Sequence, residues 1–126
     1  MADLLRDTVE VVDAGPVEER RAVADGFTLS LVTFRATVDG APLLKGLPED
    51  KCHCAHWGYV TKGEVSFTVQ GEEQIYKAGD HFYIPPIGHT PAATADSQYV
   101  MFSPTEELAK TEAVMEKNIR AMMGEH

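Results

Sequence analysis

The sequence has few basic residues and no long apolar run, and each shortage argues against a class of protein. Among its 126 residues, 11 Lys and Arg stand against 20 Asp and Glu, which gives a formal net charge of -9. Nucleic acids need a basic face for their phosphates, and an acidic membrane surface would repel such a chain. No stretch approaches the ~18 apolar residues needed to span a bilayer. We therefore expect neither a nucleic-acid nor a membrane partner.

Cysteine is also scarce, because Cys52 and Cys54 are the only two and are separated by a single residue. A disulfide between them would be strained and would close almost no loop. Thiol or thiolate chemistry in a reducing compartment is the better interpretation. The residues from Met1 to Asp7 lack the apolar segment that follows a basic one in a signal peptide. A cytoplasmic location is the default expectation.

The chain also lacks internal repeats, low-complexity tracts and linkers. Its 126 residues suit one domain with one core, and we expect a single domain over residues 1–126. Segments rich in β-branched and aromatic residues alternate with Gly, Pro and Asp turns roughly every 8–12 residues, which indicates an antiparallel barrel or sandwich. The predicted strands cover residues 8–13, 27–38, 57–61, 64–70, 74–76, 81–84 and 98–103, whereas residues 16–26 and 40–51 are interpreted as polar or loop segments.

The end of the chain follows a helical pattern. A hydroxyl cap and acidic residues after Ser103 predict a helix from about residue 105 to 123, before Gly124. Its apolar stripe is expected to pack on the barrel or on a second subunit. The stripe consists of Leu108, Met115, Ile119 and Met122.

The segment from Cys52 to His56 contains four potential metal ligands within five residues. If the segment is extended, Cys52, Cys54 and His56 share one face. Thiolate and imidazole ligands favour zinc or iron over magnesium or calcium. The alternative is a strand end with two small apolar thiols and a surface histidine. His53 is the reserve ligand if the segment is a loop.

A second informative segment contains the Pro85-Pro86 turn and then His89. The prolines fix the backbone and Gly88 permits a close approach, so the turn presents the histidine in a defined direction. Taken alone, a turn histidine is more often exposed than not. His81, on the preceding strand, is expected to face outward.

These two segments resemble the metal-binding motifs of the cupin family, the RmlC-like jelly-roll barrels. Residues 79–89 are similar to the second motif, although the histidine arrives early. Residues 57–64 are similar to the end of the first motif. In that comparison His56 takes the place of the family's Glu, Cys52 of its second His, and Asp50 of its first His.

The chain is also similar to a subgroup of small cupins with a Cys-x3-His-Trp-Gly-Tyr-Val segment and a Pro-Pro-Gly-His turn, which Cys52, His56 and His89 match. Cys54 and His53 are additions, and Ile87 is an insertion. The likeness covers about residues 28–103. It implies an all-β, antiparallel cupin or jelly-roll β-barrel over about 27–103 with a C-terminal α-helix, one interior metal and a homodimer.

Two functions remain open at this point. Three protein ligands and an open position would suit a metal-dependent enzyme acting on a small organic molecule, of the dioxygenase, isomerase or cyclase type that the resemblance implies. Four ligands, Cys52, Cys54, His56 and His89, would make a closed site in a non-catalytic binding or structural module. Either way, the expected cofactor is one divalent transition metal, zinc or iron.

Overall fold

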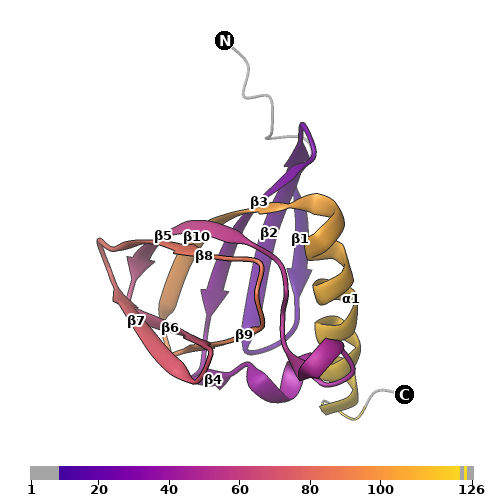
Figure 1. Cartoon of the computed structure of the whole chain (residues 1–126). Coiled ribbons are helices and arrows are strands. Elements are labelled where there is room, and N and C mark those ends of the chain that lie inside the picture. Colours follow the sequence, from indigo (N-terminus) through magenta and orange to yellow (C-terminus); the bar gives the residue numbers. More distant parts are fainter. Residues whose placement is uncertain (1–8, 123, 125–126) are drawn as a thin grey trace.

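Ten strands and one long helix form the part of the chain that the computed structural model describes, residues 9–122 and 124 (Figure 1). Two 3-10 helices, η2 (Ala41–Leu44) and η3 (Pro48–Asp50), lie in the connection before β5. The other elements are β1 (Glu10–Asp13), β2 (Val17–Ala24), β3 (Phe27–Phe34), β4 (Val38–Asp39), β5 (His56–Lys62), β6 (Glu64–Val69), β7 (Glu72–Lys77), β8 (His81–Ile84), β9 (His89–Ala93), β10 (Ser97–Pro104) and α1 (Thr105–Met122).

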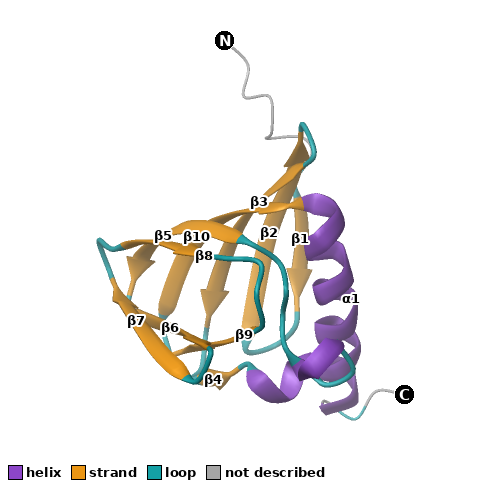
Figure 2. Ribbon diagram, in the orientation of Figure 1, coloured by secondary structure: helices purple, strands orange, loops and turns teal. Residues whose placement is uncertain are grey.

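The strands form two antiparallel sheets that face each other (Figure 2). The larger sheet has the order β1-β2-β3-β10-β5-β8, and the smaller one has the order β4-β9-β6-β7. In Figure 2, helix α1 lies beside the edge of the larger sheet that β1 forms. The predicted all-β antiparallel barrel with a C-terminal helix is confirmed.

Side-chain alternation sorts the aromatic residues of the central strands between the two faces of each sheet. Phe67 on β6 and Phe82 on β8 point inward, with 2% and 5% of their surface exposed. Trp57, Tyr59 and Tyr83 point outward and are more than 40% exposed. The period of two in the sequence therefore identifies the core face of these strands, because adjacent side chains lie on opposite faces of a pleated sheet.

Helix α1 packs its apolar stripe on the protein's own barrel. Leu108 and Ile119 are buried, Met115 is partly buried against the core, and Met122 is exposed. The side-chain amide of Asn118 donates to two carbonyl groups around η2, which ties the helix to that turn. The last residue of the predicted helix, 123, lies outside the described residues. No described helix is long and apolar enough to cross a membrane.

The first predicted strand is present as β1, whereas two other strands were not expected. Residues 16–26, interpreted as a polar segment, contain β2, and β9 follows the proline turn. The pattern of β2 is hidden because Glu19 and Arg21 point inward, where they pair with charged groups of α1 or with each other. The prediction assigned polar residues to the solvent face, and it fails here because these charged side chains have partners in the folded protein.

Candidate metal centre

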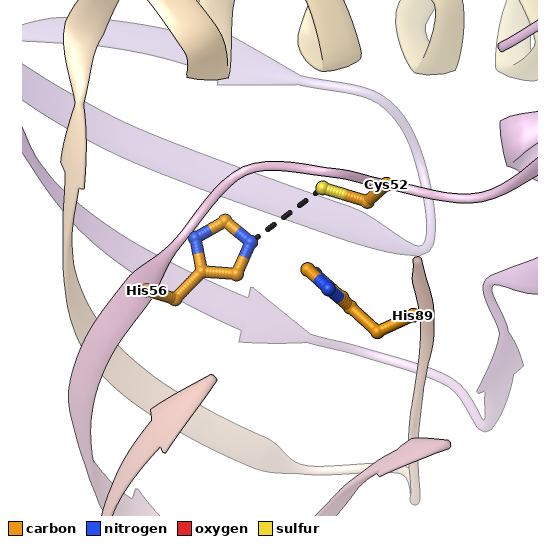
Figure 3. Close-up of side chains that lie close together, drawn as sticks. All are labelled: Cys52, His56 and His89. Carbon is orange, nitrogen blue, oxygen red and sulfur yellow. Dashed lines mark hydrogen bonds between the residues drawn. The ribbon is translucent and has the colours of Figure 1, made fainter. Parts of the chain in front are cut away.

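Three side chains from the two predicted motif segments meet inside the barrel (Figure 3). The potential ligand atoms of Cys52, His56 and His89 all lie within 4.8 Å of one another. Each residue is at most 4% exposed. The sequence therefore predicts three residues that the fold brings together from separate segments.

Backbone pairing fixes the position of Cys52 relative to His89. The amide of each residue donates to the carbonyl oxygen of the other, with both N–O distances at 3.0 Å. This pairing places the proline turn beside the segment that carries the thiol.

Each imidazole is oriented by a hydrogen bond at Nδ1, which leaves Nε2 available. In His89, Nδ1 donates to the Ile87 carbonyl at 2.9 Å, and Nε2 is buried with no hydrogen-bond partner among the described residues. In His56, Nδ1 lies 2.7 Å from the Ser103 hydroxyl, and Nε2 lies 3.7 Å from the Cys52 sulfur. Histidines that bind metals are held in this way, with one ring nitrogen on an outer partner and the other on the ion.

Burial sets the protonation of all three groups. It lowers the pKa of His56 to about 3, with a further contribution from His89, and it also lowers the pKa of His89. Burial raises the pKa of the Cys52 thiol. At neutral pH both imidazoles are neutral; the Nε2 atom of His89 has no partner among the described residues, and that of His56 contacts the Cys52 sulfur. The thiol must lose its proton to become a ligand.

The donor set fits a divalent transition metal. One sulfur and two imidazole nitrogens are typical ligands of zinc or iron. The Thr111 hydroxyl of α1 lies 3.3 Å from the Cys52 sulfur and can donate to the thiolate once it forms. The unpartnered Nε2 of His89 is the observation that a bound ion would explain, because buried polar atoms are rarely left without a partner.

The structure does not bring Cys54 and His53 into this group. Residues 53–55 are not part of a strand, so the alternation that would align Cys54 with Cys52 does not apply. Cys54 is buried, and its sulfur lies 3.4 Å from the Ala55 carbonyl oxygen. The His53 ring contacts Glu49 and the Lys51 carbonyl. His81 is exposed on β8, as expected.

Asp50 also lies apart from the three clustered side chains. Its carboxylate accepts the Gly46 amide in the loop after η2, at 3.0 Å. The place that the family pattern gives to its first histidine is therefore occupied here by a turn residue.

A cavity of about 110 Å³ opens beside the three side chains, between the sheets and α1. Most of its walls are apolar. Cys52, His56 and His89 line one part, and α1 contributes Thr111 and Glu112. Its apolar walls include Val32, Phe34, Leu44, Phe67, Met101, Leu108 and Met115.

Carboxylates form a second polar part of the cavity wall, which the sequence does not reveal. Arg21 lies 3.0 Å from Glu19, 2.9 Å from Glu112 and 3.2 Å from Glu116, and we call these four residues the carboxylate cluster. Burial and then a hydrogen bond with Glu19 raise the pKa of Glu112 to about 9. Nothing in the sequence links residues 19 and 112, because only the packing of α1 on the barrel brings them together.

Comparisons with known proteins agree with this architecture. The family model described as "Cupin domain" matches residues 50–103, which include all three clustered side chains. No curated protein matches the chain. Ectoine synthase from P. lautus is 17% identical, with a TM-score of 0.62 over 89% of this chain and 86% of that chain.

Two further solved structures are similar over most of the chain. An RmlC-like cupin from Shewanella frigidimarina is 19% identical, with a TM-score of 0.57 over 82% of this chain and 92% of that chain. The polyketide cyclase RemF from Streptomyces resistomycificus is 16% identical, with a TM-score of 0.57 over 83% of this chain and 80% of that chain. At these identities the structures show a shared fold.

Two facing antiparallel sheets around an interior Cys-His-His group define a small β-barrel protein with a candidate metal centre. The family model matches the part of the chain that contains both motifs, residues 50–103, as a cupin domain. The described chain has the fold of RmlC-like cupins.

Proposed function

We propose that this cupin is a metal-dependent enzyme that acts on a small organic molecule in the barrel cavity. The observation that carries the proposal is the buried group of Cys52, His56 and His89, in which the Nε2 atom of His89 has no partner among the described residues. Three ligands of this kind leave a coordination position open to a substrate or water, as in catalytic rather than structural metal sites.

The chain's own residues supply positioning and exclusion of water. Ser103 and the Ile87 carbonyl hold the two imidazoles, and Thr111 supports the sulfur. Apolar walls of the cavity keep bulk water out, which strengthens interactions between charged groups. A bound zinc or iron ion would supply Lewis acidity toward an oxygen or nitrogen atom of the substrate.

The reaction class that we favour is a ring closure or isomerisation. Two proteins with similar folds are a polyketide cyclase and an ectoine synthase. Glu112 offers an acid–base group in the same cavity. Cytoplasmic action is part of this proposal, because two free buried thiols suit a reducing compartment.

Metal analysis of protein purified without chelator tests the proposal first. We expect one zinc or iron ion per chain. Cobalt(II)-loaded protein should then change its visible spectrum when azide is added, because azide can occupy the open position. Cys54→Ser should leave the metal content and the azide response unchanged. A protein that takes up no metal contradicts the proposal, and a cobalt spectrum that ignores azide and depends on Cys54 indicates a closed structural site instead.

We also propose that the protein is a homodimer. The dimer proposal is supported by the outer face of the larger sheet, where four aromatic side chains on neighbouring strands are each more than 40% exposed. They are Phe27, Trp57, Tyr83 and Phe102. Contiguous exposed aromatics are typical of interaction surfaces. Light scattering should give twice the chain mass, and Trp57→Glu should give the mass of one chain. Ile75→Glu, which changes an exposed apolar residue of β7 in the other sheet, is the matched control.

A further inference from the structure

The carboxylate cluster carries more negative charge than its arginine can balance. Arg21 contacts Glu19, Glu112 and Glu116, and it also contacts Glu10 on β1. The side chains of Glu19 and Glu112 are only 12% and 17% exposed. One guanidinium against four carboxylates leaves an excess of negative charge in a partly buried place, where water screens it poorly.

The charged and titratable groups that face this excess come from four elements and from the segment before β5. They are Glu10 from β1, Glu19 and Arg21 from β2, Tyr99 from β10, Glu112 and Glu116 from α1, and the thiols of Cys52 and Cys54. The pKa of Glu112 is raised to about 9, and the pKa of the buried Tyr99 phenol is raised as well. Without a ligand, the cluster therefore reduces its charge by keeping a proton on Glu112 at neutral pH.

The same cavity also contains the unpartnered nitrogen on which the proposed function rests. Glu19, Glu112 and Glu116 line it together with His89, which is 1% exposed and whose Nε2 atom has no hydrogen-bond partner in the described part of the chain. A molecule in the cavity therefore meets both nitrogen and sulfur donors and carboxyl groups. Most of the other lining residues are apolar.

We propose that the cavity selects a small organic cation, with a primary ammonium group that binds Glu19 and Glu112 and a short apolar body. An ammonium group donates three hydrogen bonds, which suits two carboxyl groups that already share one hydrogen bond. This cation is the substrate class of the metal-dependent activity proposed above, and the role of Cys52, His56 and His89 in binding it rests on that activity. Binding of the ammonium group by Glu19 and Glu112 needs no metal.

Binding of such a cation should displace the proton that Glu112 keeps. The ammonium group enters with its charge and the Glu112 proton leaves to solvent, so the complex has the same net charge as the free protein and a better paired cluster. Affinity should therefore increase with pH from neutral toward about 9, the pKa of Glu112.

Three probes of equal length test the selection: butylamine, 1-butanol and butyrate. Their four-carbon bodies suit this cavity of about 110 Å³. A somewhat larger cavity of about 150 Å³ in another protein holds benzene, which has six carbons. Titrations of metal-free protein, followed by NMR chemical shifts, should show butylamine binding about 10-fold more tightly than 1-butanol, and butyrate most weakly. Metal-free protein is used so that amine coordination to an ion cannot imitate the result.

Glu112→Gln should remove the preference for butylamine, and Glu19→Gln should weaken it. Glu107→Gln, an exposed position on the same helix, should leave the preference unchanged. Equal binding of amine and alcohol by the wild-type protein overturns the proposal, and so does a preference that survives in both cavity variants. If the amine preference is present but the protein never takes up metal, the metal-dependent function fails while the ligand class stands.

Discussion

The cavity lining has two polar parts that differ in chemistry and come from different parts of the chain. In the first, the metal end, Cys52, His56 and His89 lie within a stretch of 38 residues and are uncharged at neutral pH in the absence of metal. In the second, the carboxylate end, Glu19 and Glu112 come from β2 and α1 and surround Arg21. Burial acts on both, yet it favours loss of a proton from the imidazoles and retention of a proton by the carboxyl group.

Both shifts have the same cause, because burial favours the neutral form of a group. For histidine the neutral form is the ligand, so burial prepares His56 and His89 for a metal. For glutamate the neutral form is the acid, so burial gives Glu112 a proton that it can donate or lose to a cation. The same apolar cavity therefore prepares its imidazoles as potential metal ligands and keeps its carboxyl group in the acid form.

Removal of a ligand at the metal end should have the largest effect. We expect His56→Ala and His89→Ala each to abolish stoichiometric metal, because two remaining donors are too few for a stable site. Metal content after dialysis, measured by mass spectrometry, checks this. His81→Ala, an exposed histidine on β8, is the control and should keep its metal. Retention of metal by either cavity variant would falsify the assignment of that ligand.

Removal of the arginine from the carboxylate cluster should lower the stability of the fold and leave metal binding unchanged. Arg21→Ala leaves Glu19 and Glu112 without their guanidinium, and we expect a loss of about 3 kcal/mol in the free energy of unfolding. Urea denaturation gives the value, and the metal content should not change. Arg35→Ala is the control, since its pairs with Asp13 and Glu18 are exposed and should contribute far less. Similar losses for both variants would show that burial of the cluster has no energetic consequence.

The two ends should also respond to pH in opposite directions in metal-free protein. The pKa of His56 is about 3 in the folded protein, so acid below its unfolded value of 6.5 should destabilise the fold. The pKa of Glu112 is about 9, so stability should fall as pH rises from its unfolded value of 4.5 toward 9. Each slope is at most about 1.4 kcal/mol per pH unit.

Urea denaturation at a series of pH values from 3 to 9 measures both slopes. Glu112→Gln should flatten the alkaline limb and leave the acid limb unchanged. An alkaline limb that is identical in wild type and variant would mean that Glu112 is ionised in the folded protein at neutral pH.

The smallest effect should come from the hydroxyl that orients His56. Ser103→Ala removes the partner at 2.7 Å from Nδ1, and we expect metal affinity to fall about 10–100-fold while stoichiometry is kept. Competition with a chromophoric chelator measures the change. Ser66→Ala, on β6 and outside the cavity lining, serves as the control. An unchanged affinity would show that the ring is held by packing alone.

Much of the fold follows from sequence patterns that depend on local spacing. Alternation over residues 64–70 correctly places Phe67 in the core, and the spacing of Leu108 and Ile119 correctly predicts a helix with one buried face. Strand β2 is missed because its inward positions are charged. The alternation argument for Cys54 fails because residues 53–55 do not form a strand.

Sequence patterns were enough to predict the barrel class and the grouping of Cys52, His56 and His89, because short motifs with fixed spacing carry both. The position of Cys54 outside that group, and the cavity that Glu19 and Glu112 share with it, follow from tertiary packing. Helix α1 packs on the barrel and brings together side chains more than 90 residues apart. Burial then changes the proton affinity of each group by an amount that no local pattern encodes.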